Sequence, residues 1–174
     1  MEPVTGFFYF FTDSLVVEVG ILDSRLDHIH LYEPQIFNKK SPEIDKSELP
    51  WLQKLSQEFE NYFAGKQARF SLQYPLAHQP SPFYKIVYKE LQNSSPGKTL
   101  TYKQLAELSN SPRAARAVGS AMSKNPYPLI IPCHRVLPSH GKNNGAYSAG
   151  NGEATKNYLL NLERQLFISH MEQQ

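Results

Sequence analysis

The apolar pattern of this chain changes from strand-like to helical part-way along it, and this change limits which folds are open to the sequence. Residues 7–11 and 15–21 are rich in β-forming side chains, and a third short strand is expected at residues 28–31. Between residues 51 and 63, large apolar side chains recur at helical spacing, and Gly65 is placed to end that helix. We therefore expect a small sheet near the start of the chain, followed by helices.

A proline-containing stretch, residues 73–82, separates this first part from the rest, and its composition is typical of an extended linker. We place a domain boundary near residue 80, so that residues 1–80, with the linker 73–80, form an N-terminal α/β domain and residues 81–174 a second, mostly helical domain. With 40% hydrophobic residues, the 174-residue chain can build one large or two small cores. The expected fold class is mixed α/β, of the α+β kind.

Two helix-start signals follow the linker. Thr101 and Gln104 form a capping box, so a short helix should begin directly after Thr101. Ser111 is a good N-cap and Pro112 a good first residue for a second helix, which should end near residues 125–126. Its expected apolar face consists of Ala114, Ala117, Val118, Ala121 and Met122. Two short helices joined by a tight turn predict a helix-turn-helix, whose second helix commonly enters a DNA groove.

The other face of the second helix is small or basic, as a nucleic-acid backbone requires. Its residues are Arg113, Ala115, Arg116, Gly119, Ser120 and Ser123. The net charge of +2 decides nothing, but the charge is unevenly distributed: residues 1–84 hold 7 basic and 11 acidic residues, and residues 85–156 hold 10 basic and 3 acidic ones. A phosphate backbone would be attracted to the second half of the chain.

The only cysteine, Cys133, lies at the end of an apolar, strand-like run and is followed by His134 and Arg135. A thiol at neutral pH is only a few per cent thiolate, so a nucleophilic cysteine needs a base or a positive environment that lowers its pKa. We expect His134, Arg135 and a partner elsewhere to supply these. A lone cysteine can also pack as a small hydrophobic residue. The nucleophile is favoured here because three prolines restrict the backbone before it: Pro126, Pro128 and Pro132.

Taken in order and spacing, these motifs resemble the O6-alkylguanine-DNA alkyltransferase family. The motifs are Thr101-Tyr102, Arg-Ala-Ala-Arg-Ala-Val-Gly at 113–119, Asn125-Pro126 and Ile-Pro-Cys-His-Arg-Val at 131–136, and the resemblance covers residues 81–163. It implies repair of duplex DNA without a cofactor. An alkyl group would pass irreversibly from O6-alkylguanine, and as an open possibility from O4-alkylthymine, to the protein's own cysteine after the base is flipped out.

The resemblance also implies roles for individual residues. Cys133 would be the acceptor, and His134 would draw off its proton through a water. Glu163 would orient and charge that histidine. Arg116 would fill the space left in the base stack, and Tyr102 would crowd the target phosphate and help to protonate the leaving guanine. This is the logic of a catalytic triad with a water interposed.

A further set of residues is assigned by the same resemblance to the hinge and base pocket. Asn125 would be the hinge before an active-site Pro-Cys-His-Arg strand, and the carbonyl of Val136 would receive the guanine amino group. The remaining pocket residues are Met122, Tyr147, Ser148 and Lys156. Residues 139–155 are rich in Gly and Asn and longer than the loop that usually closes over the base.

A metal site is not expected. Some members of the family bind zinc in the N-terminal domain through cysteine and histidine, but this chain has no second cysteine. His28 and His30 alternate in a strand-like stretch and could be ligands, yet such a pair is more often simply polar. We interpret them as polar strand residues.

Three other classes of protein remain open: a lesion-recognition module without transfer activity, a cysteine hydrolase with a Cys-His-Glu triad, and a helix-turn-helix regulator. Cys133 argues against the first, because related alkyltransferase-like proteins lack the acceptor cysteine. The sequence contains neither a basic-then-apolar leader nor an apolar run long enough to span a membrane. We expect a cytoplasmic protein that associates with the nucleoid when it binds DNA, without a membrane partner. It should act as a monomer, with cooperative binding along DNA left open.

Overall fold

The computed structural model describes residues 2–66, 69–71, 74–139 and 145–171. Its first part is an antiparallel sheet in the order β1 (Gly6–Phe11), β2 (Val16–Leu22) and β3 (Arg25–Tyr32). The expected strands are confirmed, and β3 is longer than predicted. A short 3-10 helix, η1 (Lys46–Glu48), leads into α1 (Pro50–Phe63), which also confirms the helix expected from the apolar spacing.

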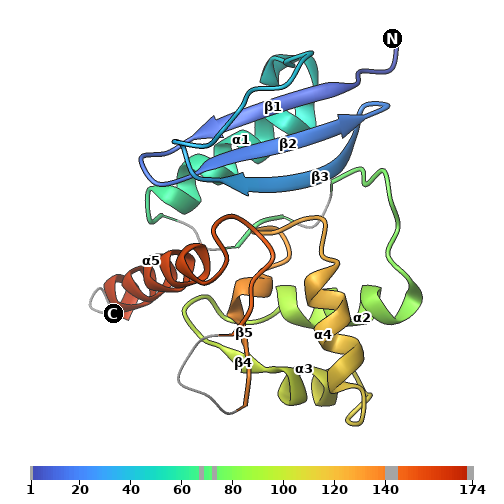
Figure 1. Cartoon of the computed structure of the whole chain (residues 1–174), viewed down its shortest axis with the longest axis vertical. Coiled ribbons are helices and arrows are strands. Elements are labelled where there is room, and N and C mark those ends of the chain that lie inside the picture. Colours follow the sequence, from blue (N-terminus) through green and yellow to red (C-terminus); the bar gives the residue numbers. More distant parts are fainter. Residues whose placement is uncertain (1, 67–68, 72–73, 140–144, 172–174) are drawn as a thin grey trace.

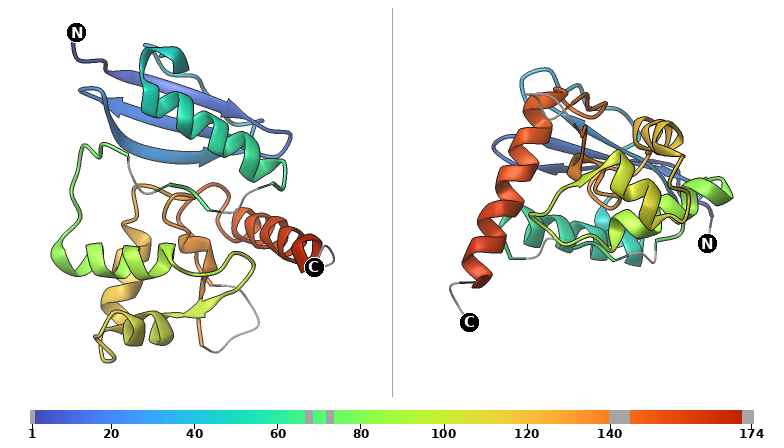
Figure 2. Two further views of the ribbon diagram at one scale, coloured as in Figure 1. Left: turned by 180° about the vertical axis from the view of Figure 1, so that it is seen from behind. Right: turned by 90° about the horizontal axis from the view of Figure 1, so that it is seen from below.

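Helix α1 lies across one face of the three-stranded sheet (Figures 1 and 2). The ring centroids of Phe10 on β1 and Phe59 on α1 are 5.6 Å apart, and Leu52, Leu55 and Phe59 are completely buried. Gly65 has a φ of +74°, a left-handed conformation that favours glycine and ends the helix as predicted. Apolar burial between the helix and the sheet therefore forms the first part of the core.

The second part of the chain forms a body of helices and one small parallel sheet below the first (Figure 1). Its elements are α2 (Pro82–Gln92), β4 (Leu100–Thr101), α3 (Tyr102–Leu108), α4 (Ala115–Ser123), the 3-10 turn η2 (Cys133–Arg135), β5 (Val136–Leu137) and α5 (Glu153–Met171). The mixed α/β class, with a small sheet followed by mostly helical structure, is confirmed. The division into domains near residue 80 stays a prediction.

The first helix of the predicted helix-turn-helix begins as expected, because the Thr101 side chain accepts from the Gln104 amide and the Gln104 side chain accepts from the Thr101 amide. The predicted start of the second helix is wrong. Helix α4 begins at Ala115, and the amide of Ser111 instead donates to the carbonyl of Ala106, at 2.9 Å.

This difference has a local cause. Asn110 has a φ of +54° and its amide donates to the Glu107 carbonyl, so residues 106–111 form a Schellman motif that ends α3. Ser111 is thereby used to close the preceding helix and caps nothing. Ala117, expected on the apolar face of α4, is exposed, whereas Val118, Ala121 and Met122 are buried as predicted.

The proline-containing stretch is attached to the sheet rather than free of it. The amide of Leu26 on β3 donates to the Pro75 carbonyl, and the amide of Ala77 donates to the Leu26 carbonyl, both at 2.8 Å. Further along β3, the amide of Ile29 donates to the carbonyl of Pro126 at 2.7 Å. The outer edge of β3 therefore holds the chain just after α4. Among the described residues, every helix is too short or too polar to cross a lipid bilayer.

The capping box generates a stability prediction. We expect Thr101→Ala to lower the free energy of unfolding by about 1 kcal/mol, because the amide of Gln104 loses its acceptor. Urea denaturation of both proteins measures this difference. Thr99→Ala, at an exposed threonine two residues earlier, is the matched control and should be nearly neutral. Equal losses in the two variants would show that the cap contributes nothing.

Candidate active site

Cys133 is held by a tight sequence of turns, and the expected Pro-Cys-His-Arg strand is not present. Pro132 has φ −78° and ψ 63°, and the amide of Cys133 donates to the Ile131 carbonyl at 2.8 Å, which defines an inverse γ-turn. The amide of Arg135 then donates to the Pro132 carbonyl, so Cys133 begins the 3-10 turn η2. Proline fixes φ near the value that this turn needs. The strand begins only at Val136, after the cysteine.

Asn125 connects this turn to the end of α4. Its Nδ2 donates to the Ile131 carbonyl at 2.9 Å and lies 3.1 Å from Cys133 Sγ, while its Oδ1 accepts from the Tyr127 amide. Sequence reasoning made Asn125 a hinge but did not find its contact with the sulfur. One amide side chain thus fixes both the backbone before the cysteine and the position of the thiol.

The thiol of Cys133 is not activated at rest. It is buried, and burial raises its pKa above the ordinary value, although Asn125, Tyr147 and Lys156 act in the opposite direction. The side chains of His134 and Arg135 are both paired with Glu163, and the positive charge that acts on the thiol is that of Lys156. The sulfur therefore needs a proton acceptor in order to become a nucleophile.

His134 is such an acceptor. Its ring is completely buried, and Nε2 lies 2.8 Å from Glu163 Oε1. An ionised carboxylate only accepts hydrogen bonds, so Nε2 carries the proton and Nδ1 has a free lone pair. Nδ1 is buried without a hydrogen-bond partner among the described residues. Burial lowers the pKa of His134 although Glu163 opposes this, so the imidazole is neutral at pH 7 and can accept a proton at Nδ1.

Glu163, on α5, binds groups from three other segments: the reactive turn, α1 and the turn before β4. Arg135 forms a forked pair with it through Nε and Nη2, at 2.8 and 2.9 Å. The Tyr62 hydroxyl on α1 donates at 3.0 Å, and the amide of Gly97 donates at 3.1 Å. Burial alone would raise the pKa of Glu163, but His134 and Arg135 hold it well below its usual range.

The partners Tyr62 and Gly97 were not identified as site residues from the sequence. The apolar spacing of α1 indicated that Tyr62 belongs to the core, which it does with 1% exposure, but spacing gives no information about its hydroxyl. Gly97 lies in the turn before β4, where it has a φ of +72°. A buried tyrosine normally finds a partner for its hydroxyl. This tendency was the only feature of the sequence that could have indicated a role for Tyr62 in the site.

A cavity of about 250 Å³ opens beside the thiol. Its lining brings together residues that the sequence places far apart: Tyr102, Gly119, Met122, Ser123, Cys133, Ala146, Tyr147 and Ser148. Gly119 on α4 faces Tyr102, and a Cβ there would lie 4.0 Å from the tyrosine ring. The beginning of α3, the inner face of α4 and the segment before α5 therefore enclose the cysteine from three directions.

Two of the expected pocket residues, Lys156 and Val136, do not line this cavity. Lys156 is almost completely buried, with 1% exposure, and its Nζ donates to the Val136 carbonyl at 2.7 Å. Burial lowers the pKa of Lys156. The Val136 carbonyl still has a second lone pair, so it can accept one more hydrogen bond. Lys156 thus holds β5 directly after the reactive turn.

The exposed face of α4 agrees with the charge pattern of the sequence. Arg116, Ser120 and Ser123 are exposed on the helix, and Arg113 is exposed in the turn before it; Ala115 and Gly119 are partly buried. The predicted closing loop, residues 139–155, is described only in part, since residues 140–144 lie outside the described residues. Within the described part, Ser148 is exposed at the rim of the cavity and Tyr147 is half-buried.

Comparison with known proteins identifies the family. The model of the "6-O-methylguanine DNA methyltransferase, DNA binding domain" matches residues 82–165. The methylated-DNA–protein-cysteine methyltransferase of Haemophilus influenzae is 34% identical over 166 residues, which cover 95% of this chain and 90% of that protein. The chain belongs to the methylated-DNA–protein-cysteine methyltransferase family. The constitutive methyltransferase of Bacillus subtilis is 38% identical over 129 residues, or 74% of this chain and 73% of that one.

Solved structures agree with this assignment to the methyltransferase family. Mycobacterium tuberculosis OGT in complex with DNA has a TM-score of 0.73 and 26% identity, and the match covers 92% of this chain and 93% of that one. The O6-methylguanine-DNA methyltransferase of Pyrococcus kodakaraensis has a TM-score of 0.67, 26% identity and coverage of 90% and 97%. The likeness extends over both parts of the chain, including the sheet, where the sequence motifs gave little information.

The charge pair of Glu163 generates a pH-dependent prediction. We expect Glu163→Gln to destabilise the protein by about 3–5 kcal/mol at pH 7, because Arg135 would lose its buried counter-charge. The pKa of Glu163 is depressed in the folded state, so its stabilising effect is present above the unfolded-state value, about 4.3, and is lost as the pH falls through the folded value. The difference between the two proteins should therefore shrink below about pH 4.

Urea denaturation at a series of pH values measures this difference. Glu107→Gln, at a glutamate with 49% side-chain exposure on α3, is the matched control and should differ little from the parent at any pH. A difference for Glu163→Gln that does not depend on pH would contradict the assignment of the depressed pKa.

Proposed function

We propose that this protein repairs duplex DNA by moving the alkyl group of O6-alkylguanine onto Cys133 in a single, irreversible turnover. The observation that carries the proposal is the position of Cys133. Its sulfur lies in a cavity of about 250 Å³ that is lined by the inner face of α4 and lies beside a buried His134–Glu163 pair. Membership of the methyltransferase family supplies the reaction class. The site provides a thiol to accept the alkyl group, a histidine to accept the thiol proton, and room for a nucleobase.

The transfer balances without a cofactor. Cys133 Sγ attacks the alkyl carbon, the bond between that carbon and guanine O6 breaks, and its electron pair leaves with guanine. The thiol proton passes through a water to His134 Nδ1, whose lone pair is available because Nε2 donates to Glu163. Tyr102, at the cavity wall, delivers a proton to the departing guanine, and solvent then carries the proton from His134 to the tyrosinate, so that both side chains return to their starting forms. The products are unmodified guanine and a thioether.

Single use follows from the chemistry of the product. The thioether has no proton to lose, and alkylation removes the only thiol of the chain. Because the resting thiol has a raised pKa, reaction depends on proton transfer to His134 at the moment of attack. A buried, protonated cysteine is also protected from other electrophiles and from oxidation.

Duplex DNA would reach the site along the exposed face of α4. The Arg113 and Arg116 side chains are available for phosphate or base-stack contacts, and the small residues Ala115, Gly119 and Ser120 allow close approach. The cavity has room for a single base, so the target must leave the stack. Extrusion costs a few kcal/mol, and Arg116 would offset part of this by occupying the vacated space.

The decisive experiment is mass spectrometry of the intact protein and its peptides after mixing with an equimolar duplex that carries one O6-methylguanine. We expect one methyl group per chain, on the peptide that contains Cys133, and none with unmodified duplex. Cys133→Ala should gain no mass and should bind the lesion duplex about as tightly as the parent. Binding without mass gain in the parent would indicate a lesion-recognition module. Absence of both would favour the hydrolase.

Arg116 provides a second prediction. We expect Arg116→Ala to slow transfer from duplex DNA by about tenfold or more, because base extrusion loses its support. Transfer from the free base O6-benzylguanine should be nearly unchanged, since no base must be extruded. Single-turnover rates on the two substrates make the comparison. Arg164→Ala, at an exposed arginine on α5, is the matched control. Equal losses on both substrates would exclude the role of Arg116 in extrusion.

A further inference from the structure

A second cluster of polar side chains lies on the face of the sheet opposite α1, away from Cys133. Glu18, in the central strand β2, is completely buried there. It is paired in register with His30 on β3, and the neighbouring pair is Gly20 with His28. A Cβ at Gly20 would lie 2.3 Å from His28 Cε1, so only glycine lets the imidazole lie over β2 and reach towards Glu18.

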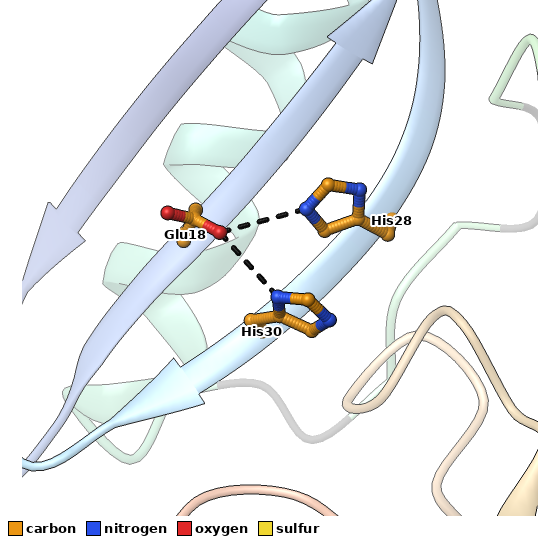
Figure 3. A group of neighbouring side chains, drawn as sticks. All are labelled: Glu18, His28 and His30. Carbon is orange, nitrogen blue, oxygen red and sulfur yellow. Dashed lines mark ion pairs between the residues drawn. The ribbon is translucent and has the colours of Figure 1, made fainter. Parts of the chain in front are cut away.

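The donor atoms of Glu18, His28 and His30 converge (Figure 3). Glu18 Oε1 is 3.5 Å from His28 Nε2 and 3.4 Å from His30 Nδ1, and the ligand atoms all lie within 4.8 Å of one another. Four tetrahedral ligands at zinc bond lengths are roughly 3.3 Å apart. The three side chains are therefore already near the spacing of a zinc site that has three protein ligands and one open position.

The hydrogen bonding of His28 leaves one ring nitrogen available to a metal ion. His28 Nδ1 lies 2.7 Å from Asp27 Oδ2, so in the neutral ring Nδ1 donates to that carboxylate and Nε2 is the nitrogen that faces Glu18. Within the described residues, His28 Nε2 is buried without a hydrogen-bond partner, and the Glu18 oxygen that faces it, Oε1, is 3.5 Å away. A metal ion placed between these two atoms would bind both of them.

Asp27 completes the arrangement that metal-binding histidines usually have, in which the second ring nitrogen donates to a carboxylate. Asp27 is itself held by His78 Nε2 at 2.8 Å, outside the cluster. The orientation of His28 is thus set by groups that would not touch the ion. The sequence favoured two polar strand residues because it did not reveal Glu18 on the neighbouring strand.

At present a side-chain ammonium partly neutralises Glu18. Lys40 Nζ lies 2.8 Å from Glu18 Oε1 and 3.4 Å from the Tyr32 hydroxyl. Lys40 is 45% exposed and comes from the segment between β3 and α1, so its side chain can swing into solvent. It is a competitor for the carboxylate and leaves His28 Nε2 without a partner.

We propose that Glu18, His28 and His30 form a binding site for a divalent transition-metal ion, with Zn²⁺ as the best-fitting ion, and that the ion displaces Lys40. Two imidazoles and one carboxylate are a ligand set that suits zinc. The ion would join β2 to β3, whose outer edge holds the Pro126 carbonyl through Ile29. The site is thus structural and separate from Cys133, and it does not depend on the proposed repair function.

The test is calorimetric titration of ZnCl₂ into the full chain after treatment with a chelator, in a Cys133→Ala background that removes the only thiol. We expect one ion per chain. His30→Ala changes a half-exposed side chain, so the fold is retained, and it should weaken binding by about tenfold or more. Asp13→Asn, which removes an exposed carboxylate between β1 and β2, is the control and should bind like the parent.

Lys40 distinguishes this site from adventitious binding elsewhere on the surface. Lys40→Met should tighten zinc binding, because the competing ammonium is removed. Lys39→Met, which removes the neighbouring lysine paired with Glu43, should leave the affinity unchanged. The proposal stands only if His30→Ala weakens and Lys40→Met strengthens binding. Absence of zinc uptake by the parent, or any other combination of these two results, overturns it.

Discussion

The buried carboxylate of Glu163 is the interaction on which the arrangement of the site depends. It fixes the tautomer of His134, neutralises Arg135 and accepts from Tyr62 and Gly97, so that α1, α5, the turn before β4 and the reactive turn meet at one group. Ionised carboxylates are costly to bury unless every oxygen is used. Here both oxygens accept several hydrogen bonds. The same contacts that stabilise the charge also give His134 the lone pair that the proposed proton transfer uses.

The backbone of the reactive turn connects this charge centre to the helix-turn-helix. The inverse γ-turn at Pro132 and the 3-10 turn after it lead directly into β5, whose Leu137 is paired with Thr101 on β4. Thr101 is also the N-cap of α3, so Tyr102 is placed at the cavity by the same two-residue ladder. From the opposite side, Asn125 connects the end of α4 to the cysteine. If binding to DNA shifted α4, the movement would therefore reach the thiol of Cys133 through only a few bonds.

The sheet has two different faces, and both bear on the second part of the chain. One face packs against α1 with apolar and aromatic side chains, and α1 in turn supplies Tyr62 to the charge centre. The other face carries the cluster of Glu18 with His28 and His30. At the outer edge of the sheet, the amide of Ile29 on β3 donates to the Pro126 carbonyl. The N-terminal part of the chain is thus a support for the reactive turn as well as a separate candidate for metal binding.

The sequence by itself determined the strands, α1, the start of α3 and the family, because these depend on apolar period, capping chemistry and short motifs that local residues specify. The acceptor role of Cys133 stays a prediction. It misplaced the start of α4, since the closing of α3 used Ser111, and it predicted a strand where Pro132 produces a turn. Only the tertiary structure decided the partners of Glu163 and the convergence of Glu18 with two histidines. Those contacts join residues up to 101 positions apart, and no local pattern indicates which buried polar groups will meet.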